Sequence, residues 1–252
     1  MPKYRDLAAV LRDQIERGEL PPGEKLPFTD ELVAQYGYSK HTVRAAVQLL
    51  VDEGLVIARR RYGTVVRDRR KVRIPLARYE RSLASQGQLG PFEAACQEQG
   101  LNGEMSKVKV ERVRDPEVAA RLGLASEDDL VCRRREALID KQAVQFQYAW
   151  YPLDVAARAG LEQEGKIQGG IYRRLIERGI PAVEADERVI ARAPTQEEAS
   201  DLGTGTGIPV LTIERVSKDS TGRPLEFLRV IAAADRLELS YDALPLPGLD
   251  PA

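Results

Sequence analysis

Polar side chains that can donate hydrogen bonds are concentrated in one short stretch of the chain. Within six residues the sequence places Ser39, Lys40, His41, Thr42 and Arg44. Lysine and arginine neutralise phosphate charge, and arginine and small polar side chains also read base edges in the DNA major groove. A second basic cluster follows at Arg59-Arg-Arg-Tyr-Gly63. These residue types at this spacing favour binding to a nucleic acid.

Catalysis is a weaker interpretation of the same sequence. His41 is the single histidine, so no serine or cysteine elsewhere has a histidine base of its own. One histidine, Cys96 and Cys132 are too few for a Cys/His zinc site within one chain. The segment Gly203–Gly207 looks like a phosphate-binding loop, but Pro209 and a β-branched run follow it where a helix should begin. We therefore expect a loop there, and no enzyme, cofactor or metal.

The elements that must position the polar stretch can be read from periodicity and capping residues. Apolar residues at helical spacing predict a helix from Tyr4 to Gly18, and a second short helix spans 29–36. Gly37 makes a turn, and Ser39 is a suitable N-cap for a third helix that ends at Gly54. Two β-branched runs around an arginine-rich tip predict a hairpin over 55–66.

This order of elements is typical of a winged helix-turn-helix, whose second motif helix presents its first residues to base edges. The hairpin tip would reach phosphates or the minor groove, and Gly63 would permit close backbone approach. The alternative is that His41 and the arginine run are solvated surface side chains that do not contact DNA. The predicted DNA-binding residues are Ser39, Lys40, His41, Thr42, Arg44, Arg60, Arg61, Tyr62 and Gly63.

The first 66 residues resemble the GntR family of bacterial regulators in four segments, 19–27, 39–46, 49–56 and 63–66. By this resemblance, Lys40, His41 and Arg44 occupy positions that contact DNA in that family. The chain departs from the family at Phe28-Thr-Asp30, where Ser-Glu-Arg is usual. Asp30 would repel phosphate, so we expect an atypical operator or a slightly different docking.

The remaining residues show an arrangement that recurs after 80 residues. A short helix ends at Leu122-Gly123 and again at Leu202-Gly203, and each is followed by two predicted strands. Arg135 and Arg215 share this offset. A degenerate duplication would merge two similar halves into one antiparallel sheet with a pocket where they meet. Chance recurrence of a common motif is the alternative.

Residues 89–245 resemble the UTRA effector domain of the HutC subfamily, which has a chorismate-lyase-like fold and dimerises. The resemblance rests on 118–124, 130–135, 170–172 and 222–226, followed by Arg229 and Asp235-Arg236. It implies that the effector pocket is lined by Arg135, Gln147, Tyr172 and Glu226. Gly170, Gln147 and Leu237 replace the usual Ser, Glu and Tyr of sugar-phosphate sensors. These changes argue against a phosphorylated amino sugar, whereas Arg135 favours an anionic ligand.

Length and charge agree with an α+β protein of two domains, a winged helix-turn-helix over 1–68 and an antiparallel-sheet effector domain over 89–245, joined by a linker over 69–88. Residues 1–73 carry a charge of about +5 and the rest about −6, so the basic N-terminal part of the chain suits binding to DNA. No signal peptide or membrane span is apparent, and we expect a cytoplasmic homodimer. The leading hypothesis is a transcriptional regulator that acts as a repressor and binds an operator and a small effector. The alternative is an enzyme that acts on a small anionic metabolite through the lyase-like domain.

Overall fold

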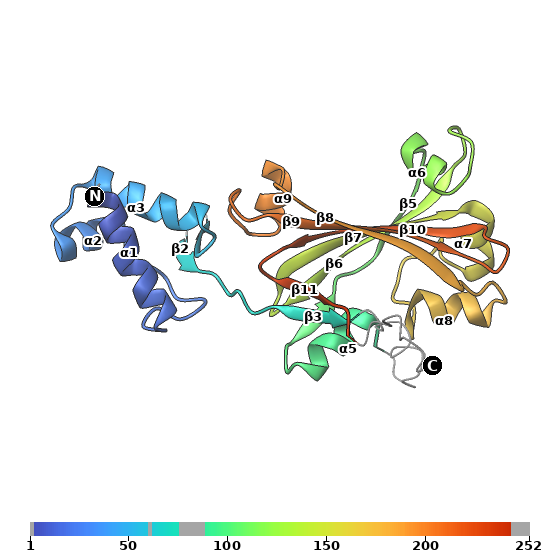
Figure 1. Ribbon diagram of the computed structural model, residues 1–252, viewed down its shortest axis with the longest axis horizontal. Helices are drawn as coiled ribbons and strands as arrows, with labels where there is room; N and C mark the ends of the chain where they lie inside the picture. Colours follow the sequence, from blue (N-terminus) through green and yellow to red (C-terminus); the bar gives the residue numbers. More distant parts are fainter. Residues whose placement is uncertain (1–2, 60–61, 76–88, 243–252) are drawn as a thin grey trace, which may run out of the picture. The chain divides into compact units, whose positions relative to one another are not determined.

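The computed structural model describes residues 3–59, 62–75 and 89–242 (Figure 1). The chain divides into two compact units. The first comprises Met1–Arg70, Ala191–Leu211 and Ala232–Arg236, and the second comprises Lys71–Ile190, Thr212–Ile231 and Leu237–Ala252.

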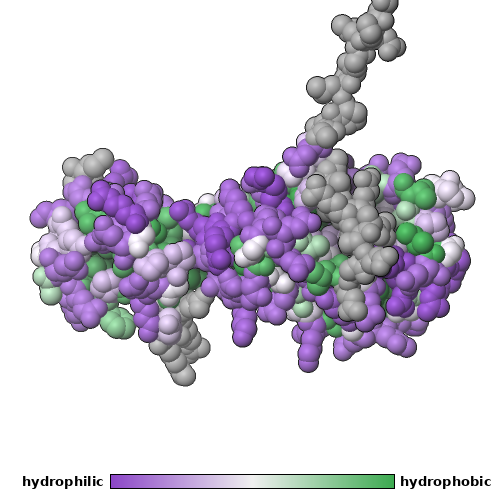
Figure 2. Space-filling model, turned by 90° about the horizontal axis from the view of Figure 1, so that it is seen from below, coloured by the Kyte–Doolittle hydropathy of each residue, from purple (hydrophilic) through white to green (hydrophobic). Residues whose placement is uncertain are grey.

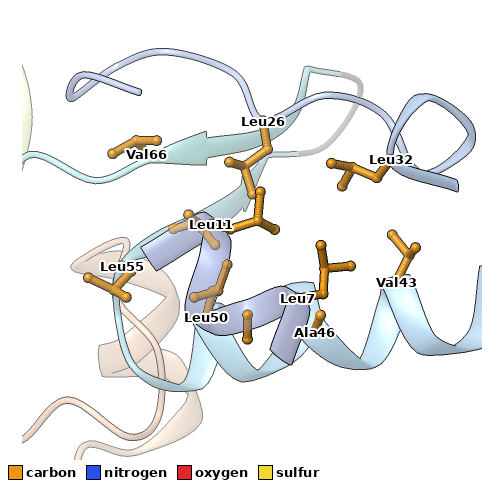
Figure 3. Close-up of a cluster of buried hydrophobic side chains, with 11 residues drawn as sticks. Leu7, Leu11, Leu26, Leu32, Val43, Ala46, Leu50, Leu55 and Val66 are labelled. Atoms are coloured by element: carbon orange, nitrogen blue, oxygen red, sulfur yellow. The ribbon is translucent and has the colours of Figure 1, made fainter. Parts of the chain in front are cut away.

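The first unit contains the predicted winged helix-turn-helix. Its helices are α1 (Lys3–Glu16), α2 (Thr29–Tyr36) and α3 (Lys40–Asp52), and its hairpin pairs β1 (Val56–Arg59) with β2 (Gly63–Val66) in antiparallel fashion. The apolar faces of all these elements meet in one core that includes Leu7, Leu11, Leu32, Val43 and Leu50 (Figure 3). Burial of this core fixes which face of α3 remains outside.

Local signals set the start of α3. Gly37 adopts a left-handed conformation with φ of 70°, which ends α2 at little steric cost. The Ser39 side chain accepts a hydrogen bond from the Thr42 backbone N–H at 3.1 Å, as expected of an N-cap. The predicted turn and cap are therefore confirmed.

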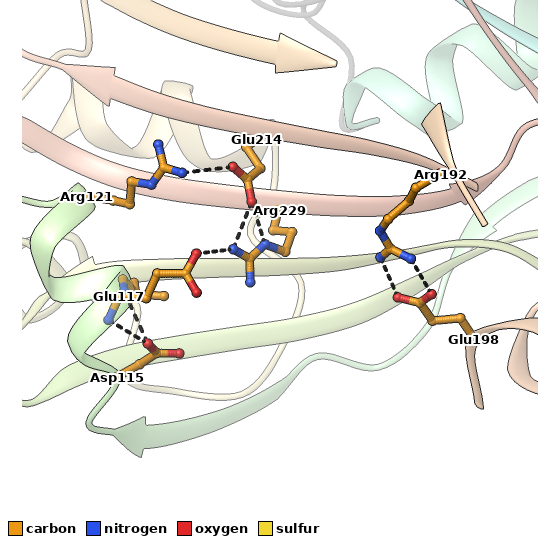
Figure 4. Close-up of polar contacts among 8 residues, drawn as sticks. Asp115, Glu117, Arg121, Arg192, Glu198, Glu214 and Arg229 are labelled. Atoms are coloured by element: carbon orange, nitrogen blue, oxygen red, sulfur yellow. Dashed lines mark hydrogen bonds and ion pairs between the residues drawn. The ribbon is translucent and has the colours of Figure 1, made fainter. Parts of the chain in front are cut away.

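The same unit includes α9 (Gln196–Asp201) and the loop after it. The Thr195 and Glu198 side chains form a capping box at the start of this helix. Arg192 binds both oxygens of Glu198, at 2.7 and 2.6 Å (Figure 4). After α9, Leu202–Pro209 form turns and no helix, which confirms that the glycine-rich segment is a loop.

A mainly antiparallel sheet is built from two hairpins and belongs largely to the second unit. Its strands are β4 (Gly103–Met105), β5 (Lys109–Val113), β6 (Leu130–Ile139), β7 (Gln142–Pro152), β8 (Glu184–Arg192), β9 (Val210–Lys218) and β10 (Pro224–Ala233). Their order is β4-β6-β7-β10-β9-β8, and β5 also pairs with β6. The hairpins β6–β7 and β9–β10 are thus neighbours in one sheet, as the repeat predicted. The α+β class is confirmed.

Helices lie on both sides of this sheet (Figure 1). On one side, α6 (Pro116–Arg121) covers a cluster with Trp150 and Phe227. Glu214 of β9 binds Arg121 and Arg229 there, at 3.4 and 2.8 Å (Figure 4). On the other side lie α5 (Pro91–Glu98) and α8 (Gly170–Glu177), and α7 (Leu153–Ala159) follows β7.

Some elements differ from the sequence-based expectations. The strands β4 and β5 are separate and pair with different parts of β6. The predicted linker contains β3 (Val72–Pro75), which pairs in parallel with β11 (Leu237–Ser240). Residues 76–88 of that linker lie outside the described part of the chain. β3 was missed because four residues carry little periodic signal and its partner lies far along the chain.

The described helices include none long and apolar enough to cross a membrane. Hydrophilic residues predominate on the face shown in Figure 2, and hydrophobic residues are scattered among them.

Candidate DNA-binding surface and ligand pocket

The first turns of α3 present their polar side chains to solvent. Ser39, Lys40, His41 and Arg44 are exposed, whereas Val43 on the opposite face is buried. This separation follows from the helical period, because the apolar stripe points into the core of the unit. The arrangement leaves the predicted DNA-binding residues of α3 accessible.

Two of these polar groups already have partners within the protein. Ser39 Oγ caps the helix and also lies 2.9 Å from Thr42 Oγ1. Lys40 Nζ lies 2.7 Å from Asp30 Oδ1, and both side chains are more than half exposed. Asp30 therefore neutralises a recognition-helix cation in the protein alone, a consequence of the unusual residue at that position.

The hairpin tip is only partly within the described residues. Arg60 and Arg61 lie outside them. Tyr62 is exposed, and Lys25 Nζ lies 3.7 Å above the centre of its ring, a cation–π contact. Gly63 has a φ of 101°, which favours glycine. Lys25 adds a basic side chain beside the tip, and it was not among the DNA-binding residues predicted from the sequence.

The second unit contains a cavity of about 140 Å³ on the α5 and α8 side of the sheet. An apolar cavity of about this size can hold a benzene-sized molecule, so the space suits a small ligand. Arg135, Gln147, Tyr172 and Glu226 all line it. The residues that the resemblance selected thus lie together around one space, although their role toward a ligand stays a prediction.

Two arginines enter the cavity from the two halves of the sheet. Arg135 of β6 donates through Nε to Gln147 Oε1 at 3.0 Å, and it forms no ion pair with any residue of 3–59, 62–75 or 89–242. Arg215 of β9 is buried, with ion-pair distances of 3.5 Å to Glu187 and 3.6 Å to Glu226. In the sequence, Arg215 stands out only by its 80-residue offset from Arg135. That symmetry was the signal that could have placed it in the site.

Glu226 joins three elements beneath the cavity and is itself buried. Its Oε1 accepts a hydrogen bond from the Tyr151 hydroxyl at 2.6 Å, and its Oε2 accepts one from the Tyr172 hydroxyl at 2.9 Å. Tyr172 also lies 2.7 Å from Ser217 Oγ. Burial and then the charge of Glu226 raise the pKa of Tyr151 well above its usual value, so this tyrosine stays protonated and donates. Both Glu226 oxygens are engaged, and the carboxylate holds α8 against the sheet.

A further arginine in the cavity wall has a structural role. Arg133 donates to the backbone carbonyls of Leu161, Gln163 and Gly165 at 2.6, 2.6 and 2.9 Å. Burial is the main reason that its pKa is lowered. These bonds fix the segment that leads into α8. Gly169 and Gly170 then line the cavity, so the position where related sensors have serine offers no hydroxyl.

Comparisons with known protein families assign both parts of the chain. Residues 3–66 match the bacterial regulatory proteins of the gntR family, and residues 98–238 match the UTRA domain. The chain is 32% identical over 248 residues to an uncharacterised HTH-type transcriptional regulator of Streptomyces coelicolor, covering 96% of this chain and 92% of the relative. It is 29% identical to the HTH-type transcriptional repressor NagR of Bacillus subtilis, covering 94% and 92%.

Solved structures give the same assignment. A crystal structure of a GntR-family regulator covers 98% of this chain and 99% of its own, with 28% identity and a TM-score of 0.60. PhnF from Mycobacterium smegmatis, at 24% identity, 93% and 97% coverage and a TM-score of 0.56, shares the fold. The relatives are transcriptional regulators and not enzymes, as the sequence predicted. The chain belongs to the GntR family and is a DNA-binding transcriptional regulator whose UTRA domain makes it responsive to an effector.

Proposed function

We propose that the protein is a repressor of the HutC type, which binds a two-fold operator as a homodimer and is released by a small anionic effector. The observation that carries the proposal is Arg135, whose guanidinium faces the cavity without an acidic partner among the described residues. A buried or half-buried cation of this kind favours a carboxylate or phosphate of a ligand. The NagR relative is named a repressor, which supports the sign of the regulation.

The predicted DNA contacts are carried by α3 and by the hairpin tip. Exposed Lys40, His41 and Arg44 supply donors for bases and phosphates, and Tyr62 and Gly63 belong to the tip. A regulator of this class meets DNA in the cytoplasm of a bacterium, and two-fold operators match two-fold dimers. Lys40, His41 and Arg44 thus belong to the DNA interface. The effector site consists of Arg135, Gln147, Tyr172 and Glu226.

The ligand contacts that the cavity offers are unequal. Arg135 can bind an anion directly, and Gln147 can present its amide next to it, because the two residues are opposite each other on β6 and β7. Glu226 already accepts bonds from two tyrosines, so its contribution is to position Tyr172. Ligand specificity would then come from Arg135, Gln147 and Tyr172, within walls that include Ile213, Leu228 and Val230.

DNA binding is tested by fluorescence anisotropy with labelled DNA from upstream of the protein's own gene, with an unrelated duplex as competitor. Arg44→Ala should weaken specific binding by about 1–3 kcal/mol, because a base or phosphate contact is lost. Arg17→Ala is the matched control, since it removes the same charge from an exposed position in another part of the unit. The DNA-binding role of α3 would be contradicted if competitor DNA and salt both abolished binding. It would also be contradicted if Arg17→Ala lost as much operator affinity as Arg44→Ala.

Effector binding is tested by thermal shift with a panel of small carboxylates and phosphorylated metabolites. A ligand that raises the melting temperature and releases the DNA should lose both effects with Arg135→Ala. Arg134→Ala is the matched control, because Arg134 lies on the same strand and is exposed outside the cavity lining. Equal loss of basal DNA binding in Arg135→Ala would indicate a structural arginine instead.

A further inference from the structure

The glycine-rich loop after α9 contacts the C-terminal end of the recognition helix. A Cβ atom on Gly205 would lie 2.2 Å from the Val51 carbonyl oxygen, and one on Gly207 would lie 2.1 Å from the Asp52 carbonyl oxygen. Neither glycine has the positive φ that would by itself require glycine. These glycines are therefore needed because the loop backbone packs directly against the last turn of α3.

The contact is reciprocal. Gly54 ends the turn after α3, and a Cβ atom there would lie 2.3 Å from Ile208 Cγ1. Ile208 thus covers the residue at which the recognition helix gives way to β1. Glycine at all three positions permits a close approach of two segments separated by about 150 residues of chain.

An ion pair between buried Arg67 and partly buried Asp235 holds the same end of the winged helix. Arg67 follows β2 and is 7% exposed. Its Nη1 donates to the Gly54 carbonyl oxygen at 2.8 Å and to Asp235 Oδ2 at 2.7 Å. Next to it, Arg236 Nε donates to the Arg70 carbonyl oxygen at 3.0 Å. These bonds give the pair a defined geometry, and removal of Asp235 would leave the buried charge of Arg67 without its acidic partner.

We call Gly205, Gly207, Ile208 and Asp235 the head seat. The seat is itself braced, since Ala234 donates its N–H to the Pro209 carbonyl oxygen at 3.0 Å and α9 is closed by its capping box. All the residues of the seat and the end of α3 belong to the first compact unit. Within α3, the seat lies against Val51 and Asp52 at the C-terminal end, whereas Lys40, His41 and Arg44 nearer the other end are exposed.

We propose that the head seat pre-orients the winged helix for operator binding and is the contact through which the effector domain controls it. When the head seat holds the winged helix-turn-helix, the DNA-reading residues stay accessible while the orientation of this domain is restricted. Less orientational entropy is therefore lost when the domain binds a fixed pair of half-sites. Leu237, which lines the cavity, directly follows Arg236 in the chain, so a ligand that contacts Leu237 would lie two residues along the chain from Asp235. The control part of this inference rests on the proposed function.

The test uses substitutions that leave the DNA-reading residues intact. Gly205→Ala and Gly207→Ala add one methyl group that meets a backbone carbonyl of α3. Both variants should bind the operator about tenfold more weakly, a size typical of coupling between sites. Thr206→Ala, on an exposed side chain of the same loop, should bind like the wild type. Affinity of the glycine variants that equals or exceeds that of the wild type would overturn the proposal.

A second measurement does not depend on DNA. Hydrogen exchange of the amides over 49–56 should be faster in Gly207→Ala and in Asp235→Asn than in the wild type, while amides over 144–152 keep their protection. Asp235→Asn adds no bulk. If circular dichroism shows that an alanine variant is misfolded, the exchange rates of Asp235→Asn over 49–56 test the proposal instead. Unchanged exchange over 49–56 in a folded variant would refute the seat. If the wild type lacks specific DNA binding while the variants show these exchange changes, the proposed function alone is refuted.

Discussion

Asp30→Asn tests whether the unusual acid near the recognition helix weakens DNA binding. In the protein alone, Asp30 Oδ1 lies 2.7 Å from Lys40 Nζ, and both side chains are largely exposed. An exposed pair of this kind contributes about 0–1 kcal/mol to stability. Asp30 also lies in the first turn of α2, where a negative charge contributes about 0.3–1 kcal/mol. The substitution should therefore lower stability by no more than about 1–2 kcal/mol.

Its effect on DNA affinity should have the opposite sign. Removing the carboxylate ends its repulsion of phosphate, which amounts to about 1 kcal/mol for charges about 4 Å apart in water. It also releases Lys40 to bind a phosphate. One additional phosphate contact steepens the slope of the logarithm of the DNA-binding constant against the logarithm of salt concentration by about 0.9 for each winged helix-turn-helix, or about 1.8 for a dimer.

The assay is anisotropy of operator DNA over a series of salt concentrations. Asp30→Asn should bind severalfold more tightly than the wild type at low salt and should show the steeper slope. Asp13→Asn is the control, because it removes an exposed acid from α1 that pairs with Arg17 and has no contact with Lys40. An unchanged slope, a weaker affinity, or an equal gain in the control would refute the reasoning.

Three further outcomes are expected. Glu226→Gln should lower the free energy of unfolding by about 3 kcal/mol in urea titrations, because the buried Arg215 loses a charged partner, and unchanged stability would contradict the structural role of the carboxylate. Burial by itself raises the pKa of Asp68, but the hydrogen bonds from Arg70 and the charge of Arg236 outweigh it, so the net pKa is lowered. Its stabilisation is complete above the unfolded-state pKa of about 4 and is lost as the pH falls through the lower folded value. Asp68→Asn should thus reduce the melting temperature at pH 7 and flatten its decrease in acid, and an equally steep acid decrease in the variant would show that this pair is not responsible. Burial, with nearby carboxylates, raises the pKa of Cys96 and Cys132 to about 11, so both thiols should react with Ellman's reagent at pH 8 only after unfolding, and fast labelling of folded protein would contradict this.

The sequence by itself determined the local elements of the head and the chemistry of its exposed face. The bounds of α2 were predicted as found, and Ser39 was recognised as the cap of α3, because caps, glycine turns and the helical period act between residues close in the chain. The polar character of Lys40, His41 and Arg44 was equally evident. The four cavity residues were taken from a family resemblance rather than from spacing, and the cavity then brought them together.

Only the tertiary structure decided which distant residues become partners. β3 pairs with β11, Asp30 neutralises Lys40, and Glu226 accepts bonds from two tyrosines on different elements. The glycine-rich loop was assigned correctly as a loop, but its contact with α3 could not be foreseen. The physical reason is that burial and hydrogen bonding between segments far apart in the chain depend on where the backbone brings them. A glycine required for space looks the same in the sequence as one required for a turn.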